Sequence, residues 1–345
     1  MPRSGSSWGY RRALVSSGLV GSIALTCALS GTVPTASAAA SPVPAGSTMA
    51  DDGAFVASVA LLDPRMVDVR ISSPAVGATV PVRLLLPPGW SSTANRTWPV
   101  LYLLQGAHDD YTSWTRETGI EAFTADKDVI VAMPSGGPTG IPTRWLDGGA
   151  DSPDYEAFDV TELWQLLRRD FRAGPVRALA GVSTGGYGAI ALAAHHPGAF
   201  TAAASYSGIL DTTSLGMPAI IDAIVAREDV QPAALWGDLS ANAGLWAADN
   251  PYALASNLRW TSVFLSSGSG LAPGGQGGAP DNLLLGESLE RALWAQAKSF
   301  AARLQVLGIP AQTDFYQGGV HDWPAWRGAF TASWPLLAAG LGLPS

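Results

Sequence analysis

The chain has 345 residues, of which 47% are hydrophobic and only 14% are charged. That composition supports a sizeable buried core and argues against a disordered chain. The formal net charge is −8, and an acidic chain repels phosphate backbones, so we expect no nucleic-acid partner.

The first forty residues are typical of an export signal. Arg11 and Arg12 form a positively charged start, and a mostly apolar stretch with small residues follows over residues 13–30. Residues 36–38 (ASA) offer a cleavage site with small residues at both ends. We therefore predict a signal peptide over residues 1–40 and a secreted protein, free or associated with the cell envelope.

A membrane anchor is the alternative for this segment. Its apolar stretch contains Ser, Gly and Thr, which makes it a weak spanning helix. The only cysteine, Cys27, lies within the predicted signal, so the mature protein is expected to contain no disulfide and no thiol.

The mature chain is predicted to begin with a lead-in and then to alternate strands and helices. Residues 41–53 are rich in Pro, Ser and Gly, and we expect a flexible lead-in over residues 41–61. Short apolar runs predict strands at residues 66–71, 80–86, 100–104, 129–133, 176–181, 202–205, 263–266 and 312–316. Helical spacing of apolar residues predicts helices at residues 157–172, 185–195, 289–307 and 326–341.

This alternation predicts the fold class. It indicates an α/β protein with a mostly parallel central sheet and helices on both faces, built as one domain over residues 62–345. Residues 212–260 break the rhythm, and we expect them to form an insertion over the carboxyl edge of the sheet.

A serine motif marks the candidate nucleophile. Residues 181–185 read Gly-Val-Ser-Thr-Gly and match the pattern G-x-S-x-G. The motif follows a predicted strand and opens a predicted helix, which is the context of a nucleophile elbow in an α/β-hydrolase. Ser183 is therefore the predicted nucleophile, with small residues on both sides to allow a tight turn.

A serine hydroxyl needs a base, and the chain has four histidines. His195 and His196 end the helix that follows the motif, where a structural role at a helix C-terminus is expected. His108 follows a predicted strand and could line the site. His321 lies in the loop after the last predicted strand, where this fold places its base.

The acid partner is expected between the nucleophile and the base in the sequence. The candidates are Asp281, Glu287 and Glu290. Spacing alone does not choose among the three.

Four separated stretches resemble the antigen 85 mycolyltransferases and the related esterase D-like secreted esterases. They are residues 103–114 (LLQGAHDDYTSW), 181–211, 235–251 (LWGDLSANAGLWAADNP) and 321–326 (HDWPAW). They occur in the family's order and together span most of the mature chain. The resemblance implies an α/β-hydrolase fold and acyl-enzyme chemistry.

The resemblance also implies roles for individual residues. Ser183 matches the family's nucleophile and His321 its base, and the pair Leu289-Glu290 aligns with a family Leu-Glu pair whose glutamate is the acid. The family's oxyanion hole, built from two backbone N–H groups, falls on Ala107 and Thr184.

Three further positions are predicted substrate contacts. Gln105 and His108 stand where the mycolyltransferases carry an Asp and an Arg that help to hold trehalose. Trp323 matches a family tryptophan beside the histidine and could contact an acceptor or the acyl group.

The sequence therefore predicts a secreted serine esterase that cleaves carboxylic esters by a Ser-His-Glu mechanism, with no metal or organic cofactor. Because the acceptor-holding pair differs, water is the expected acceptor. An acyltransferase that moves acyl groups onto trehalose or another envelope sugar is the alternative. A non-catalytic envelope-binding protein on the same fold is a second alternative.

Overall fold

A computed structural model describes residues 48–146, 152–270 and 280–344, with the side chains of residues 280–285 left undescribed. The predicted signal peptide over residues 1–40 lies outside the described residues. In the described part, no helix is long and apolar enough to cross a membrane.

The core of the fold is a sheet with the strand order β1-β2-β3-β5-β4-β6-β7-β8-β9. The pairs from β1 to β3, and the pair β3–β5, are antiparallel, whereas every pair from β5 through β4 to β9 is parallel. The strands are β1 Phe55–Leu61, β2 Met66–Ser73, β3 Ala78–Leu85, β4 Trp98–Leu104, β5 Ile130–Pro134, β6 Ala173–Val182, β7 Ala202–Tyr206, β8 Ser262–Gly268 and β9 Ala311–Tyr316. The predicted mostly parallel sheet is confirmed.

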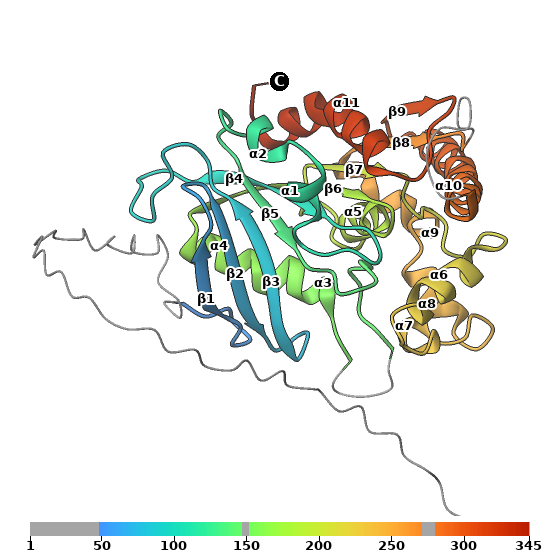
Figure 1. The fold of residues 1–345 in the computed structure, drawn as a ribbon, viewed down its shortest axis with the longest axis horizontal. Helices are drawn as coiled ribbons and strands as arrows, with labels where there is room; N and C mark the ends of the chain where they lie inside the picture. Colours follow the sequence, from blue (N-terminus) through green and yellow to red (C-terminus); the bar gives the residue numbers. More distant parts are fainter. Residues whose placement is uncertain (1–47, 147–151, 271–279, 345) are drawn as a thin grey trace, which may run out of the picture. The chain divides into compact units, whose positions relative to one another are not determined.

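Helices cover both faces of this sheet, as predicted (Figure 1). The α-helices are α1 Ser113–Glu117, α2 Ile120–Phe123, α3 Tyr155–Ala157, α4 Trp164–Asp170, α5 Thr184–His195, α6 Met217–Ala226, α7 Ala233–Trp236, α8 Ala243–Ala248, α9 Pro251–Leu254, α10 Pro280–Val306 and α11 Trp323–Leu341. A π-helix, Phe158–Leu163, joins α3 to α4, and a 3₁₀ helix, Ala255–Trp260, precedes β8.

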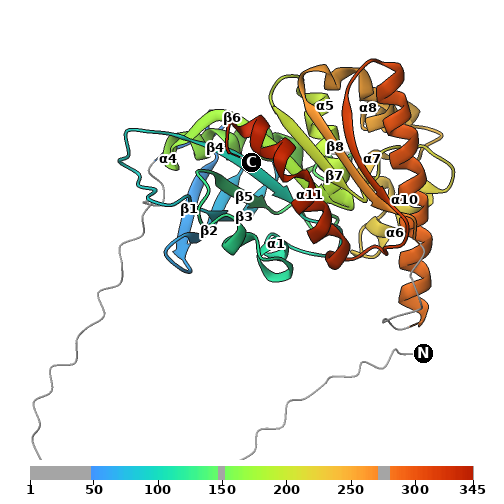
Figure 2. The same ribbon diagram turned by 90° about the horizontal axis from the view of Figure 1, so that it is seen from above.

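Two apolar layers form because the central strands are apolar on both faces. One layer packs α4, α5 and α10 against the sheet, through residues such as Leu166, Ile190 and Phe300. The other packs α11 and the short helices α1 and α2 against the opposite face, through residues such as Trp114 and Leu337. Figure 2 looks onto α11 where it lies over the sheet.

The expected flexible lead-in is wrong over its last residues. Residues 55–61 form the edge strand β1, which pairs antiparallel with β2. Val56 and the preceding Ala54 are fully buried. Pairing and burial stabilise this strand, and neither is visible in the local composition on which the prediction rested.

Two helices differ from their predicted extents. The helix predicted over residues 157–172 is α3, the π-helix and α4 in succession. The helix predicted from residue 289 extends back to Pro280 in α10. Proline is tolerated in the first turn of a helix and an isolated glycine such as Gly286 costs only about 1 kcal/mol, so neither ends the helix.

Residues 212–260 contain α6 to α9 and the 3₁₀ helix. They have an apolar cluster of their own, which includes Met217, Trp236 and Trp246. Tyr187 and Ala191 of α5 belong to the same cluster. The segment is therefore packed on the helix that follows the serine motif.

Candidate active site

Ser183 lies at the turn between β6 and α5, in a backbone conformation that residues other than glycine seldom adopt. Its φ is +54° and its ψ is −119°. A Cβ added to Gly181 would lie 2.1 Å from the carbonyl oxygen of Gly185, and one added to Gly185 would lie 2.3 Å from that of Gln105. Only glycine fits at these two positions, so the motif's glycines are what permits this turn.

The turn brings Ser183 to His321, which follows β9. The hydroxyl oxygen of Ser183 lies 2.9 Å from Nε2 of His321. On the other side of the ring, Nδ1 of His321 lies 2.9 Å from Oε2 of Glu290. Three side chains from distant parts of the sequence thus form one hydrogen-bonded chain, in which the carboxylate orients the imidazole and the imidazole can take the serine proton.

Glu290 is fully buried, and its second oxygen is saturated with donors. Oε1 accepts hydrogen bonds from the Ser207 hydroxyl at 2.8 Å, the Ser267 hydroxyl at 2.9 Å and the Gly268 backbone N–H at 2.8 Å. Burial by itself would raise the pKa of Glu290, but the hydrogen bonds and the charge of His321 outweigh it and lower the pKa below its ordinary value. The site therefore holds this group as a carboxylate.

The groups that support this pair belong to no motif in the sequence. Ser207 follows β7 and Ser267 lies at the end of β8, so both are at the carboxyl edge of the parallel strands. Trp326 of α11 packs edge-on against the His321 ring, with centroids 4.9 Å apart, and donates its indole N–H to Ser207 at 3.1 Å. Small polar residues directly after two adjacent apolar runs were the available signal.

Of the two acid candidates with described side chains, only Glu290 meets the base. Glu287 is half-buried on the same helix, α10, and the contact to His321 is made by Glu290 instead. Asp281 is in the first turn of α10, and its side chain lies outside the described residues. Glu290 is therefore in position to act as the acid.

His195 and His196 lie at the other end of α5, away from Ser183. Nδ1 of His195 is 2.8 Å from Oε2 of Glu156, and Nε2 of His196 is 2.7 Å from Oε1 of the same carboxylate. As expected, His195 is in the last turn of the helix and the serine does not use it.

The two predicted oxyanion donors flank the serine. A Cβ added to Gly106 would lie 3.4 Å from Cβ of Ser183, so the loop that carries Ala107 runs beside the nucleophile. Thr184 is the first residue of α5, where the helix presents its positive end. In the described part of the chain, the N–H groups of Ala107 and Thr184 donate to no protein acceptor. Both are therefore free to bind a negatively charged oxygen.

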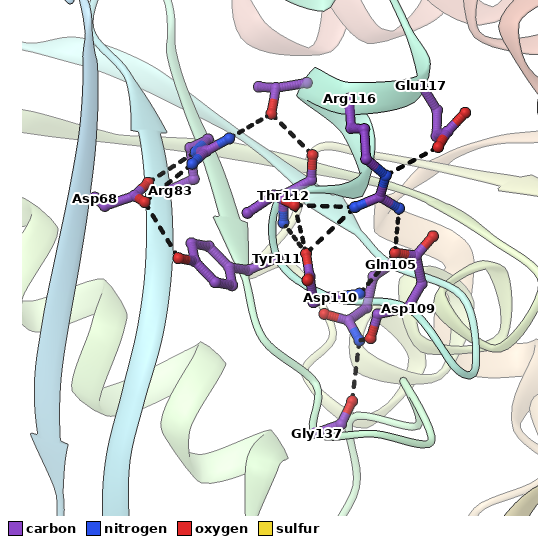
Figure 3. A network of polar contacts seen from close by, with 11 residues as sticks. Asp68, Arg83, Gln105, Asp109, Asp110, Tyr111, Thr112, Arg116, Glu117 and Gly137 are labelled. Atoms are coloured by element: carbon purple, nitrogen blue, oxygen red, sulfur yellow. Dashed lines mark hydrogen bonds and ion pairs between the residues drawn. The ribbon is translucent and has the colours of Figure 1, made fainter. Parts of the chain in front are cut away.

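Gln105 holds two loops together (Figure 3). Its side-chain amide nitrogen donates to the backbone carbonyls of Asp109 at 2.6 Å and Gly137 at 3.0 Å, and the residue is only 2% exposed. Arg116 fixes the same loop through an ion pair with Asp109 at 2.5 Å. These contacts give Gln105 a role in positioning the loop that carries Ala107.

The other two predicted substrate contacts are His108 and Trp323. His108 has a positive φ of 59° and pairs with Glu228, just beyond α6, so that it joins the first loop to the 212–260 segment. Trp323 is half-buried and packs edge-on against Trp114 and Trp326, with centroids 5.3 Å apart in both pairs. Trp326 in turn packs against His321, so Trp323 belongs to an aromatic cluster beside the base.

The strand order, the strand–serine–helix turn and the position of the histidine after the last strand define an α/β-hydrolase. Residues 73–337 match the model of the family described as "Putative esterase". The chain belongs to this esterase family.

The chain is similar to two named relatives and to one solved structure. The Mycobacterium tuberculosis protein named Esterase Rv1288 is 31% identical, over 74% of this chain and 56% of its own length, so the chain spans little more than half of that relative. The Mycobacterium ulcerans protein named diacylglycerol acyltransferase/mycolyltransferase Ag85A is 29% identical, over 79% of this chain and 81% of its own. The crystal structure of Mycobacterium tuberculosis MPT51 (FbpC1) has a TM-score of 0.66 at 23% identity, over 81% of this chain and all of that one, and supports the fold.

Proposed function

We propose that this protein is a secreted serine esterase that cleaves carboxylic esters through an acyl-enzyme on Ser183. The observation that carries the proposal is the continuous hydrogen-bonded chain from Ser183 through His321 to Glu290, with 2.9 Å at each step. Membership of the esterase family supports the same chemistry.

The proposed reaction has two halves. His321 takes the proton of Ser183 at Nε2 while the serine oxygen attacks the ester carbonyl, and the alcohol then leaves with that proton. Water, deprotonated by the same imidazole, attacks the acyl-enzyme, and the acid is released as the imidazolium returns the proton to the departing oxygen of Ser183. The N–H groups of Ala107 and Thr184 stabilise the oxyanion in both halves, and Glu290 stabilises the imidazolium.

Water is the proposed acceptor because the first loop offers little to hold a sugar. The side-chain amide of Gln105 already donates to two backbone carbonyls, and His108 is paired with Glu228. An acyltransferase is the second candidate, and what favours it is the similarity to relatives named diacylglycerol acyltransferase/mycolyltransferase.

Product analysis separates these two functions. The enzyme is given aryl esters of increasing acyl length, with and without trehalose, and the products are identified by mass. The proposal expects free carboxylic acid as the dominant product under both conditions. Acyl-trehalose as the main product would replace the esterase by the acyltransferase.

A non-catalytic envelope-binding protein is tested by labelling. An active-site serine probe should modify the wild type and leave Ser183→Ala unmodified. A wild type that takes no probe and hydrolyses none of the esters would support the binding protein.

A further inference from the structure

Besides the site at Ser183, a second group of chemically active side chains gathers at the far end of α5. Glu156 comes from α3, His195 from the last turn of α5 and Asp249 from the end of α8. Each offers one nitrogen or oxygen atom, and these three atoms lie within 4.8 Å of one another. The three elements that supply them are far apart in the sequence.

The His195 ring is held in an orientation that suits a metal ligand. Its Nε2 is 2.8 Å from the carbonyl oxygen of Ala248. A carbonyl only accepts, so Nε2 carries a hydrogen, and Nδ1 becomes a metal ligand by giving up the proton that it shares with Glu156. Nδ1 is the atom that faces Glu156, at 2.8 Å from Oε2. Metal-binding histidines are commonly fixed by such a hydrogen bond from their other nitrogen.

The two carboxylates are likewise held in place. Oδ1 of Asp249 accepts from the Thr143 hydroxyl at 2.6 Å. Oε1 of Glu156 is 2.7 Å from Nε2 of His196, which brings a second imidazole to the edge of the group. Hydrogen-bonded carboxylates beside an oriented histidine are typical of metal sites with an ordered set of ligands.

The group also borders open space. Glu156, His195, His196 and Asp249 line a cavity of about 750 Å³, together with Trp145 and Trp236. The cavity gives an ion and its water molecules a route to these three residues. All three ligating side chains are partly buried, which limits competition from bulk water.

We propose that Glu156, His195 and Asp249 bind a zinc ion, with water or His196 as the fourth ligand. Zinc accepts a mixed set of imidazole and carboxylate ligands in a tetrahedral arrangement. Calcium and magnesium prefer oxygen ligands alone, and the histidine therefore disfavours them.

The zinc is structural. α5 has 12 residues and its first residue follows Ser183, so a rise of 1.5 Å per residue separates the two sites by about 18 Å. An ion at that distance touches no reacting atom. It would tie α3 and the end of the 212–260 helices to the helix that begins at the nucleophile.

A proton shared between His195 and Glu156 is the competing occupant. In that case the group is an ion pair and needs no metal. The two cases differ in the stoichiometry of bound zinc, which can be measured directly.

The test begins with protein stripped by a chelator and dialysed at pH 8. Titration calorimetry with ZnCl₂, followed by elemental analysis of the dialysed complex, should give roughly one zinc per chain, with no comparable binding of Mg²⁺ or Ca²⁺. Zinc should also raise the melting temperature, because it binds only the folded chain. Absence of bound zinc would overturn the proposal and leave the ion pair.

Variants locate the ion. Asp249→Asn and His195→Gln should each weaken zinc binding by at least about tenfold. His108→Gln is the matched control, because it alters another histidine–carboxylate pair and should bind zinc as the wild type does. If His195→Gln unfolds, Asp249→Asn decides, since it keeps the shape of the ligand. Unchanged affinity in Asp249→Asn, or lost binding in His108→Gln, would place the ion elsewhere and overturn the proposal.

Discussion

Glu290 and His321 are 31 residues apart in the sequence, yet Oε2 of Glu290 lies 2.9 Å from Nδ1 of His321. The carboxylate is fully buried and keeps its charge because its other oxygen accepts three hydrogen bonds. This arrangement places a buried negative charge directly beside the imidazole.

Glu290→Gln should therefore lower turnover strongly and leave the fold intact. The amide keeps the shape but removes the charge that orients and stabilises the imidazolium, which costs on the order of 10⁴ in related triads. Glu287→Gln on the same helix is the control and should stay within about tenfold of the wild type. Ester hydrolysis measures both, and a fully active Glu290→Gln would reassign the acid.

The losses of turnover in Ser183→Ala and His321→Ala should not be additive. Each replacement by alanine is expected to cost on the order of 10⁴–10⁶ in turnover, because the serine is a nucleophile only while the base can take its proton. The double variant should be little worse than either single one. Steady-state kinetics on one aryl ester would reveal independent roles if the two losses multiplied.

Ser267→Ala should destabilise the protein in a pH-dependent way. The hydrogen bond from Ser267 contributes to the carboxylate form of Glu290, whose folded pKa is below its ordinary value. The stability gained from a lowered carboxyl pKa is present above the unfolded pKa and is lost as the pH falls through the folded pKa. The loss in Ser267→Ala should be about 1–3 kcal/mol at pH 7 and should shrink towards pH 3.

Ser333→Ala is the control for that prediction. Ser333 is equally buried, but its hydroxyl pairs with the neutral phenol of Tyr206 at 2.6 Å. Its loss should be nearly constant over the same pH range. Denaturant unfolding at several pH values gives both curves, and parallel curves would contradict the assigned role of Ser267.

Glu162→Gln should stabilise the protein at alkaline pH. Glu162 lies in the π-helix, and burial raises its pKa to about 7 even though Ser73 and the Ala75 N–H donate to it. An acid whose folded pKa is raised binds its proton more tightly in the folded state, so stability falls as the pH rises from about 4.5 to 7. The amide oxygen can accept from the Ala75 N–H and the amide N–H can donate to the Ser73 hydroxyl, so both contacts can be made without the charge.

The comparison for Glu162→Gln is a pair of melting curves. At pH 8 the variant should melt about 2–4 °C above the wild type, which corresponds to about 1 kcal/mol in a protein of this size. At pH 4 the two should melt together. A variant that is less stable at pH 8 would show that the charged carboxylate is the stabilising form.

The predicted export signal implies a defined N-terminus for the mature protein. The chain recovered outside the cytoplasm should begin near Ala39 or Ser41, because signal cleavage follows small residues. N-terminal sequencing of the secreted protein checks this. An intact Met1 on protein retained in the cytoplasm would contradict export.

The sequence by itself determined the chemistry-bearing residues that lie in local motifs. The elbow at Ser183 is readable because a strained turn demands glycines at fixed positions beside the serine. His321 is readable because the fold delivers its base after the last strand. The apolar runs likewise predicted the parallel strands from β4 to β8, since strands buried on both faces appear in the sequence as continuous apolar runs.

Tertiary structure alone decided what depends on contacts between distant residues. Spacing left Asp281, Glu287 and Glu290 open, and only packing of α10 beside β8 brings one of them to His321. β1 forms because β2 is there to pair with it. Ser207 and Ser267 become donors to Glu290 only because the ends of β7 and β8 meet α10 in the folded protein. A buried charge is stabilised by the dipoles that the fold brings to it.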